Sequence, residues 1–138
     1  MFHYTVQTNK SMDQVLHDLE QSLKNQKFGI LWSLDIPATL QSKGVDYTKP
    51  YRILEVCNPV KAKEVLNEAD EVGYFLPCKI AIYEDGGVTK IGLPKPTVLM
   101  ELVNRPSLQP IAAEVEKALV DAVFFASEKC RDRQPFYA

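Results

Sequence analysis

The stretch CKIAIYEDGGVTKIGL, residues 78–93, is typical of a β-hairpin and decides the fold class. Two alternating runs flank Asp85-Gly86-Gly87, and glycine readily adopts the positive φ values that tight hairpin turns require. The two-residue loop is either Asp85-Gly86 or Gly86-Gly87. Both registers place the same side chains on one face, which we expect to be buried: Cys78, Ile80, Ile82, Thr89, Ile91 and Leu93.

Three further strands are predicted on the N-terminal side of this hairpin, at residues 2–8, 28–36 and 51–57. The first two enclose a helix that Ser11 caps, with Gln14 as its capping-box partner. Residues 38–43 favour a short helical turn that ends at Gly44. Asn58-Pro59 predicts another helix start, because Asn is a good cap and Pro suits the first helical position. The buried stripe predicted for that helix is Ala62, Val65, Leu66 and Ala69.

Residues 71–77 are expected to lead back to the sheet, and residues 97–103 to form a short helix or an edge strand. Ser107 is predicted to cap a last helix over residues 108–130, whose apolar face includes Phe124 and Phe125. The order of elements predicts one α+β domain over residues 1–130, followed by a flexible tail at 131–138. We expect a sandwich with an about five-stranded, mostly antiparallel or mixed sheet and helices packed on one face.

Composition excludes several classes of protein. The 138 residues include 46% apolar and 25% charged side chains, with a net charge of −2, which is ordinary for a globular domain. No basic cluster points to nucleic acid or to a membrane surface. The N-terminus lacks the pattern of a signal peptide, and three cysteines without a CxxC motif favour a reduced, cytoplasmic protein.

Three motifs stand out along the middle of the chain: YRILEVCNP at residues 51–59, GYFLPC at residues 73–78 and Tyr83-Glu84. With these motifs the chain resembles the domain of unknown function 302 family. In that family a strand ends in Cys-Asn-Pro, and Leu-Pro-Cys opens a later one. The resemblance implies a small, uncharacterised prokaryotic α+β protein, and it brings no established catalytic residue to carry over.

The candidate ligand-binding residues are Cys57, Asn58, Cys78, Glu55 and Tyr83. Cys57 precedes a helix N-terminus, where the helix dipole lowers a thiol pKa. Antiparallel neighbouring strands would bring the two cysteines to one end of the sheet, whereas parallel strands would hold them roughly 16 Å apart. Plain packing is the other interpretation of both cysteines, since free cysteine is commonly buried. No metal ligand and no cofactor are assigned.

Two classes of function remain open at this point. The first is a small-molecule, metal or thiol-handling module built on a paired-cysteine site at Cys57 and Cys78. The alternative is a non-catalytic homo-oligomeric protein, with a homodimer formed through the wide apolar face that includes Phe124 and Phe125. The sequence does not decide whether the protein is an enzyme.

Overall fold

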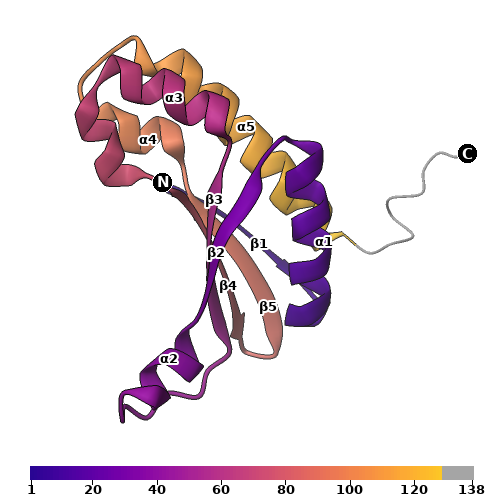
Figure 1. Cartoon of the computed structure of the whole chain (residues 1–138). Helices are drawn as coiled ribbons and strands as arrows, with labels where there is room; N and C mark the ends of the chain where they lie inside the picture. Colours follow the sequence, from indigo (N-terminus) through magenta and orange to yellow (C-terminus); the bar gives the residue numbers. More distant parts are fainter. Residues whose placement is uncertain (129–138) are drawn as a thin grey trace, which may run out of the picture.

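The structure is a computed structural model that describes residues 1–128, and its helices and strands follow one another in the order β-α-β-α-β-α-3₁₀-β-β-α-α (Figure 1). The elements are β1 (His3–Thr8), α1 (Met12–Asn25), β2 (Gly29–Asp35), α2 (Ile36–Ser42), β3 (Tyr51–Cys57), α3 (Pro59–Glu68), η1 (Asp70–Phe75), β4 (Cys78–Asp85), β5 (Val88–Pro94), α4 (Pro96–Glu101) and α5 (Leu108–Ser127).

The five strands form one sheet in the order β1-β5-β4-β3-β2, and every neighbouring pair is antiparallel. The predicted α+β class and the largely antiparallel sheet are therefore confirmed. Gly86 and Gly87 have φ values of 63° and 86°, so the hairpin loop is Gly86-Gly87 rather than Asp85-Gly86. Two consecutive positive φ values match the twist of the flanking strands.

One face of the sheet is covered and the other is open. Helices α1 and α5 pack against each other and lie along the same side of the sheet (Figure 1). Alternate strand residues point toward them and are buried, as the two-residue period of a strand requires. The buried core on this side is Val15, Leu19, Leu23, Phe28, Leu54, Val56, Ile80, Ile82, Ile91, Leu93, Leu119, Ala122, Val123 and Ala126.

A second, smaller hydrophobic cluster lies beyond one end of the sheet. It is formed where α3, η1 and α4 pack against the first half of α5 (Figure 1). Its buried members are Val65, Ala69, Val72, Met100, Leu108 and Ala112. Helix α5 is therefore shared, since its first half serves the small cluster and its second half serves the main core.

The predicted caps explain where two helices begin. The Ser11 hydroxyl accepts a hydrogen bond from Gln14 N at 3.1 Å, and the Asn58 side chain accepts from Val60 N and Lys61 N. Ser107 lies at the N-cap position of α5, but its hydroxyl makes no cap and instead donates to Glu68 Oε1 at 2.6 Å. That contact joins the start of α5 to the end of α3.

Several boundaries differ from the sequence prediction. Residues 70–75 form a 3₁₀ helix within the segment expected to lead back to the sheet, and α2 begins at Ile36 with Asp35 as its cap. Leu66, predicted to be buried, is 40% exposed, whereas Val65 and Ala69 are buried in the small cluster as predicted. Helix α5 is described to Ser127, and the predicted flexible tail at 131–138 lies outside the described residues.

A buried ion pair fastens the end of β1 to both covering helices. Lys10 Nζ lies 2.6 Å from Asp18 Oδ2 on α1 and donates to the carbonyl oxygen of Ala126 on α5 at 2.9 Å. Both charged side chains are only 9% exposed. Gln14 Nε2 donates to the other carboxylate oxygen of Asp18, at 3.0 Å. Both charges are removed from water, so the loss of either partner would leave the other as an uncompensated buried charge.

Candidate functional site

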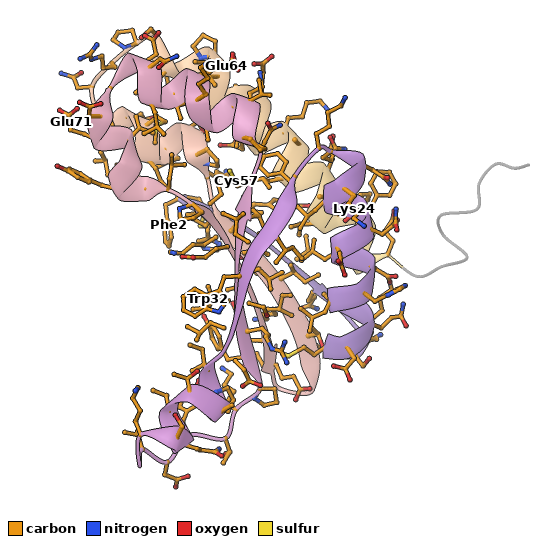
Figure 2. All side chains as sticks on the ribbon, viewed as in Figure 1. Phe2, Lys24, Trp32, Cys57, Glu64 and Glu71 are labelled. Carbon is orange, nitrogen blue, oxygen red and sulfur yellow. The ribbon has the colours of Figure 1, made fainter. Side chains whose placement is uncertain are left out.

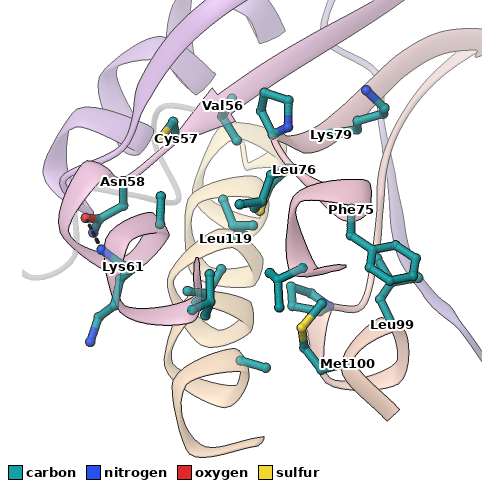
Figure 3. Close-up of a pocket in the computed structure, with 18 of the residues that line it drawn as sticks. Val56, Cys57, Asn58, Lys61, Phe75, Leu76, Lys79, Leu99, Met100 and Leu119 are labelled. Atoms are coloured by element: carbon teal, nitrogen blue, oxygen red, sulfur yellow. Dashed lines mark hydrogen bonds between the residues drawn. The ribbon is translucent and has the colours of Figure 1, made fainter. Parts of the chain in front are cut away.

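A cavity of about 330 Å³ separates the main core from the small cluster (Figure 3). Phe28, Val56 and Leu119 of the main core form one part of its wall. The small cluster forms the other part of the wall, and the cavity is the unfilled space between the two sets of side chains. The cluster residues in the wall are Val65, Val72, Phe75, Leu76, Leu99, Met100 and Ala112.

The ends of two neighbouring strands place both candidate cysteines at this cavity. Because β3 and β4 are antiparallel, the end of β3 lies beside the start of β4, and Cys78 is the register partner of Val56. Cys57 and Cys78 are both free thiols, and both line the cavity. Their side chains leave the backbone on opposite faces, since Cys57 is one residue beyond the partner of Cys78. Both cysteines thus lie at the same end of the sheet, as antiparallel strands require, but they do not form a cross-strand pair.

Burial sets the chemistry of Cys78. Removal from water raises the pKa of its thiol to about 11, and the proximity of Cys57 acts in the same direction. Near neutral pH the Cys78 thiol is therefore protonated and serves as a small, weakly polar surface in the wall. A thiolate nucleophile or a thiolate metal ligand requires the opposite shift.

The raised pKa of Cys78 predicts a loss of stability in alkali. The native state holds the thiol proton more tightly than the unfolded chain, so the contribution of Cys78 is complete below about pH 8.5. It is lost as the pH rises from there toward 11. Urea unfolding should show a fall on the order of 2 kcal/mol across this range. The Cys78→Val variant removes the titrating group, and an equally steep fall in that variant would contradict the assignment.

The cationic groups beside the cavity already have carboxylate partners. Lys61 Nζ lies 2.7 Å from Glu114 Oε1 and 3.2 Å from Glu64 Oε1, and the hydrogen bonds to Glu114 and Glu64 raise the pKa of Lys61. Lys79 Nζ lies 2.6 Å from Glu55 Oε2. The oxygen of the Asn58 side chain is used by the helix cap. These contacts leave the cavity without an unneutralised charge from either lysine.

Two of the predicted site residues lie elsewhere. Glu55 is on the open face of the sheet, opposite Lys79, and is not part of the cavity wall. Tyr83 is at the other end of β4, where its ring stacks on Tyr51 with centroids 5.0 Å apart, and Lys49 lies 5.3 Å from the Tyr83 ring centroid. The cavity thus unites Cys57, Asn58 and Cys78 but excludes Glu55 and Tyr83.

Most of the cavity wall was not predicted. Phe75 and Leu76 come from the segment expected to lead back to the sheet. Leu99 and Met100 come from the segment predicted as a short helix or an edge strand, and Ala112 comes from the last helix. The apolar run at residues 74–76, outside any alternating pattern, is the one signal in the sequence that pointed to this region.

Neither a metal centre nor a membrane segment emerges from residues 1–128. In this part of the chain, no three His, Cys, Asp or Glu side chains are grouped so that they could hold a metal ion. Within the same residues, no helix has the length and apolar character needed to cross a bilayer.

Comparison with known proteins supports one family assignment. The model of the family described as "Domain of unknown function DUF302" matches residues 4–124. A crystal structure of an uncharacterised conserved DUF302 protein from Bacillus stearothermophilus is similar at 48% sequence identity and a TM-score of 0.88, covering 93% of this chain and 99% of that one. No curated protein matches the chain. The matching sequence segment and the shared fold together show that the chain belongs to the DUF302 family.

Proposed function

We propose that the protein binds a small, uncharged and mostly apolar molecule in the cavity between its two hydrophobic clusters. The observation that carries this proposal is the cavity itself, about 330 Å³ in volume and lined chiefly by apolar side chains. Pockets of about 300–1,000 Å³ with apolar walls and a few polar groups are typical of small-molecule sites. Cys57 and Cys78 supply soft, weakly polar contacts in this proposal, and no catalytic step is assigned to them.

Charge at the cavity decides the chemical class of the ligand. A buried charge without a partner is costly, because it loses its hydration and gains no counter-charge. Lys61 and Lys79 are already paired with Glu114 and Glu55, so a ligand carboxylate would meet neutralised lysines beside existing carboxylates and gain no free counter-charge. A neutral aromatic or aliphatic molecule meets no such penalty.

Indole and indole-3-acetate test this proposal, with indole-3-acetamide as the neutral probe that has nearly the same shape as the anion. We expect indole to bind and the anion to bind at least tenfold more weakly, as measured by chemical-shift titration of the protein. Ala112→Leu projects three added carbons into the cavity from a buried wall position and should weaken indole binding at least tenfold. Ala113→Leu is the matched control, because Ala113 is the exposed neighbour on the same helix.

Two results would contradict a neutral-ligand site in the cavity. One is equal affinity for indole and its anionic analogue. The other is an affinity for indole that Ala112→Leu leaves unchanged, since the probe would then bind elsewhere. Circular dichroism of both leucine variants checks that the fold is retained.

We also propose that the chain self-associates as a homodimer, in the reducing conditions of a cytoplasm. Large apolar side chains that are more than two-fifths exposed support self-association, and free thiols at Cys57 and Cys78 suit a reducing compartment. Exposed apolar side chains occur on α5, at Phe124, and on β2, at Leu31 and Trp32. Light scattering over a range of protein concentrations tests self-association, and a monomer at all concentrations would reject it.

A further inference from the structure

We infer that the open face of the sheet, opposite α1 and α5, is the surface on which a second copy of this chain docks. This inference rests on the proposed self-association and names its interface. The open face is defined by the strand residues that point away from the covering helices, which include His3, Thr5, Gln7, Leu34, Tyr51, Ile53, Glu55, Lys79, Ala81, Tyr83, Lys90 and Gly92, together with Trp32.

The centre of the open face is apolar and low in relief. The strand register joins Thr5, Gly92, Ala81, Ile53 and Leu34 into one row across all five strands. The Thr5 side chain lies so close to Gly92 that a Cβ on this glycine would come within 2.7 Å of Thr5 Oγ1. An antiparallel sheet with one solvated face normally carries polar side chains there. This row therefore has the composition of a covered surface.

Large apolar side chains flank this row at both edges of the sheet. Trp32 on edge strand β2 is 59% exposed, and Phe2, just before edge strand β1, is 61% exposed. Figure 2 shows both side chains on the side of the sheet away from α1. Leu31, at the irregularity in the β2–β3 register, is 62% exposed. Exposed aromatic anchors around a flat apolar surface are typical of protein interfaces.

The charges on the open face favour a second copy over a charged partner. Glu55 and Lys79 are 2.6 Å apart, and Lys90 lies 2.9 Å from Asp85 at the hairpin end of the face. Each charge is thus neutralised within its own chain. Two copies of this face would not repel each other, whereas a nucleic acid or a strongly charged protein would find no unpaired counter-charge among these four residues.

The size of the open face also fits a dimer. Five strands spaced about 4.8 Å apart, each of six to eight residues rising about 3.3 Å, give a projected area of roughly 500 Å². Side-chain relief and the flanking Phe2 and Leu31 enlarge the accessible area beyond this projection. A specific interface buries about 800 Å² per partner, so the open face and its margins provide a surface of the required order.

Helix α2 adds a second observation. It contains no buried residue, and it contacts mainly β2 and β3 of its own chain. Figure 1 shows α2 at the opposite end of the sheet from the α3–α4 region. Most helices in proteins owe their stability to packing of an apolar face. A second copy seated on the open face would lie beside α2 and bury part of it.

Trp32 gives a direct test without any substitution, because it is the single tryptophan in the chain. In the dimer its indole should be shielded, so diluting the protein from about 100 µM should shift its emission to longer wavelength. Acrylamide quenching of this emission should rise in parallel with the appearance of monomer in sedimentation velocity. A Trp32 emission that stays constant while the dimer dissociates would overturn the inference.

Matched surface variants separate the open face from α5. We expect Trp32→Lys to weaken the dimer at least a hundredfold, because two lysines would enter an apolar interface. Phe124→Lys introduces the same charge at an exposed aromatic position of α5, on the covered side, and should leave the dimer intact. Each variant is first checked for wild-type circular dichroism, and the fluorescence dilution assay stands independently if Trp32→Lys fails to fold.

The outcomes distinguish the two proposals. A wild-type monomer at every concentration rejects self-association and the interface together. A wild-type dimer that survives Trp32→Lys but dissociates in Phe124→Lys supports self-association and places it on α5, which overturns the open-face inference. A dimer that dissociates only in Trp32→Lys supports both.

Discussion

Asp18→Ala is expected to lower the free energy of unfolding by about 3–5 kcal/mol, because it leaves a buried ammonium without its carboxylate. Lys10 Nζ lies 2.6 Å from Asp18 and would retain the carbonyl oxygen of Ala126 as its described acceptor. The attachment of β1 to both α1 and α5 would also weaken. Chemical denaturation of the two proteins at neutral pH measures the difference.

Two controls distinguish the cost of leaving a buried charge unpaired from the cost of losing an ion pair at the surface. Lys117→Ala removes an exposed pair, since Lys117 Nζ lies 2.8 Å from Asp121 at the surface of α5, and the expected cost is below about 1 kcal/mol. The double variant Lys10→Met/Asp18→Leu replaces both charges by apolar side chains and should recover much of the loss. A cost of Asp18→Ala as small as that of Lys117→Ala would show that the carboxylate is not needed in the fold.

Ala122→Leu is expected to cost about 3 kcal/mol, the upper part of the usual range for overpacking a filled core. Ala122 is completely buried where α5 meets α1, and the hydroxyl of Ser22 on α1 donates to its carbonyl oxygen at 2.8 Å. A larger side chain there would push the two helices apart. Thermal and urea unfolding of the variant measure the cost.

Ala112→Leu is the matched comparison on the same helix. Ala112 is also buried, but its side chain lines the cavity, so the added carbons have space to occupy. We expect this variant to change stability by less than about 1 kcal/mol. Equal destabilisation at both alanines would mean that the cavity closes up in solution, and it would count against a ligand site there.

The cavity and the open face are adjacent features of the molecule. Lys79 and Pro94 line the cavity, and the register of β1 and β5 pairs Pro94 with His3 at the margin of the open face. A second copy docked on that face would therefore lie near one margin of the proposed ligand site. Occupancy of the cavity by indole and the dimer equilibrium can be measured on the same samples.

Local sequence signals predicted most of the secondary structure, because those signals act within a few residues. Gly86 and Gly87 predicted the hairpin, Ser11 and Asn58 predicted helix starts, and the limits predicted for β3 coincide with Tyr51–Cys57. Ser107 was the exception, since a partner from α3, Glu68, takes its hydroxyl. The fold class followed from the order of these elements.

The candidate site was predicted only in part. Cys57, Asn58 and Cys78 lie at the cavity because they flank a helix start and a strand start, which are local features. Glu55 lies opposite Lys79 and outside the cavity wall, a position that depends on strand register. Tyr83 lies at the far end of β4, beside Tyr51, for the same reason.

The sequence by itself determined the alternation along the hairpin strands and the starts of α1 and α3, because these depend on backbone preferences and side-chain periods of two to four residues. Only the tertiary structure decided that β3 and β4 are antiparallel neighbours, and that two hydrophobic clusters stop short of each other and leave a cavity. It also decided which face of the sheet stays uncovered. Those outcomes depend on contacts between segments far apart in the chain, whose packing no local pattern specifies.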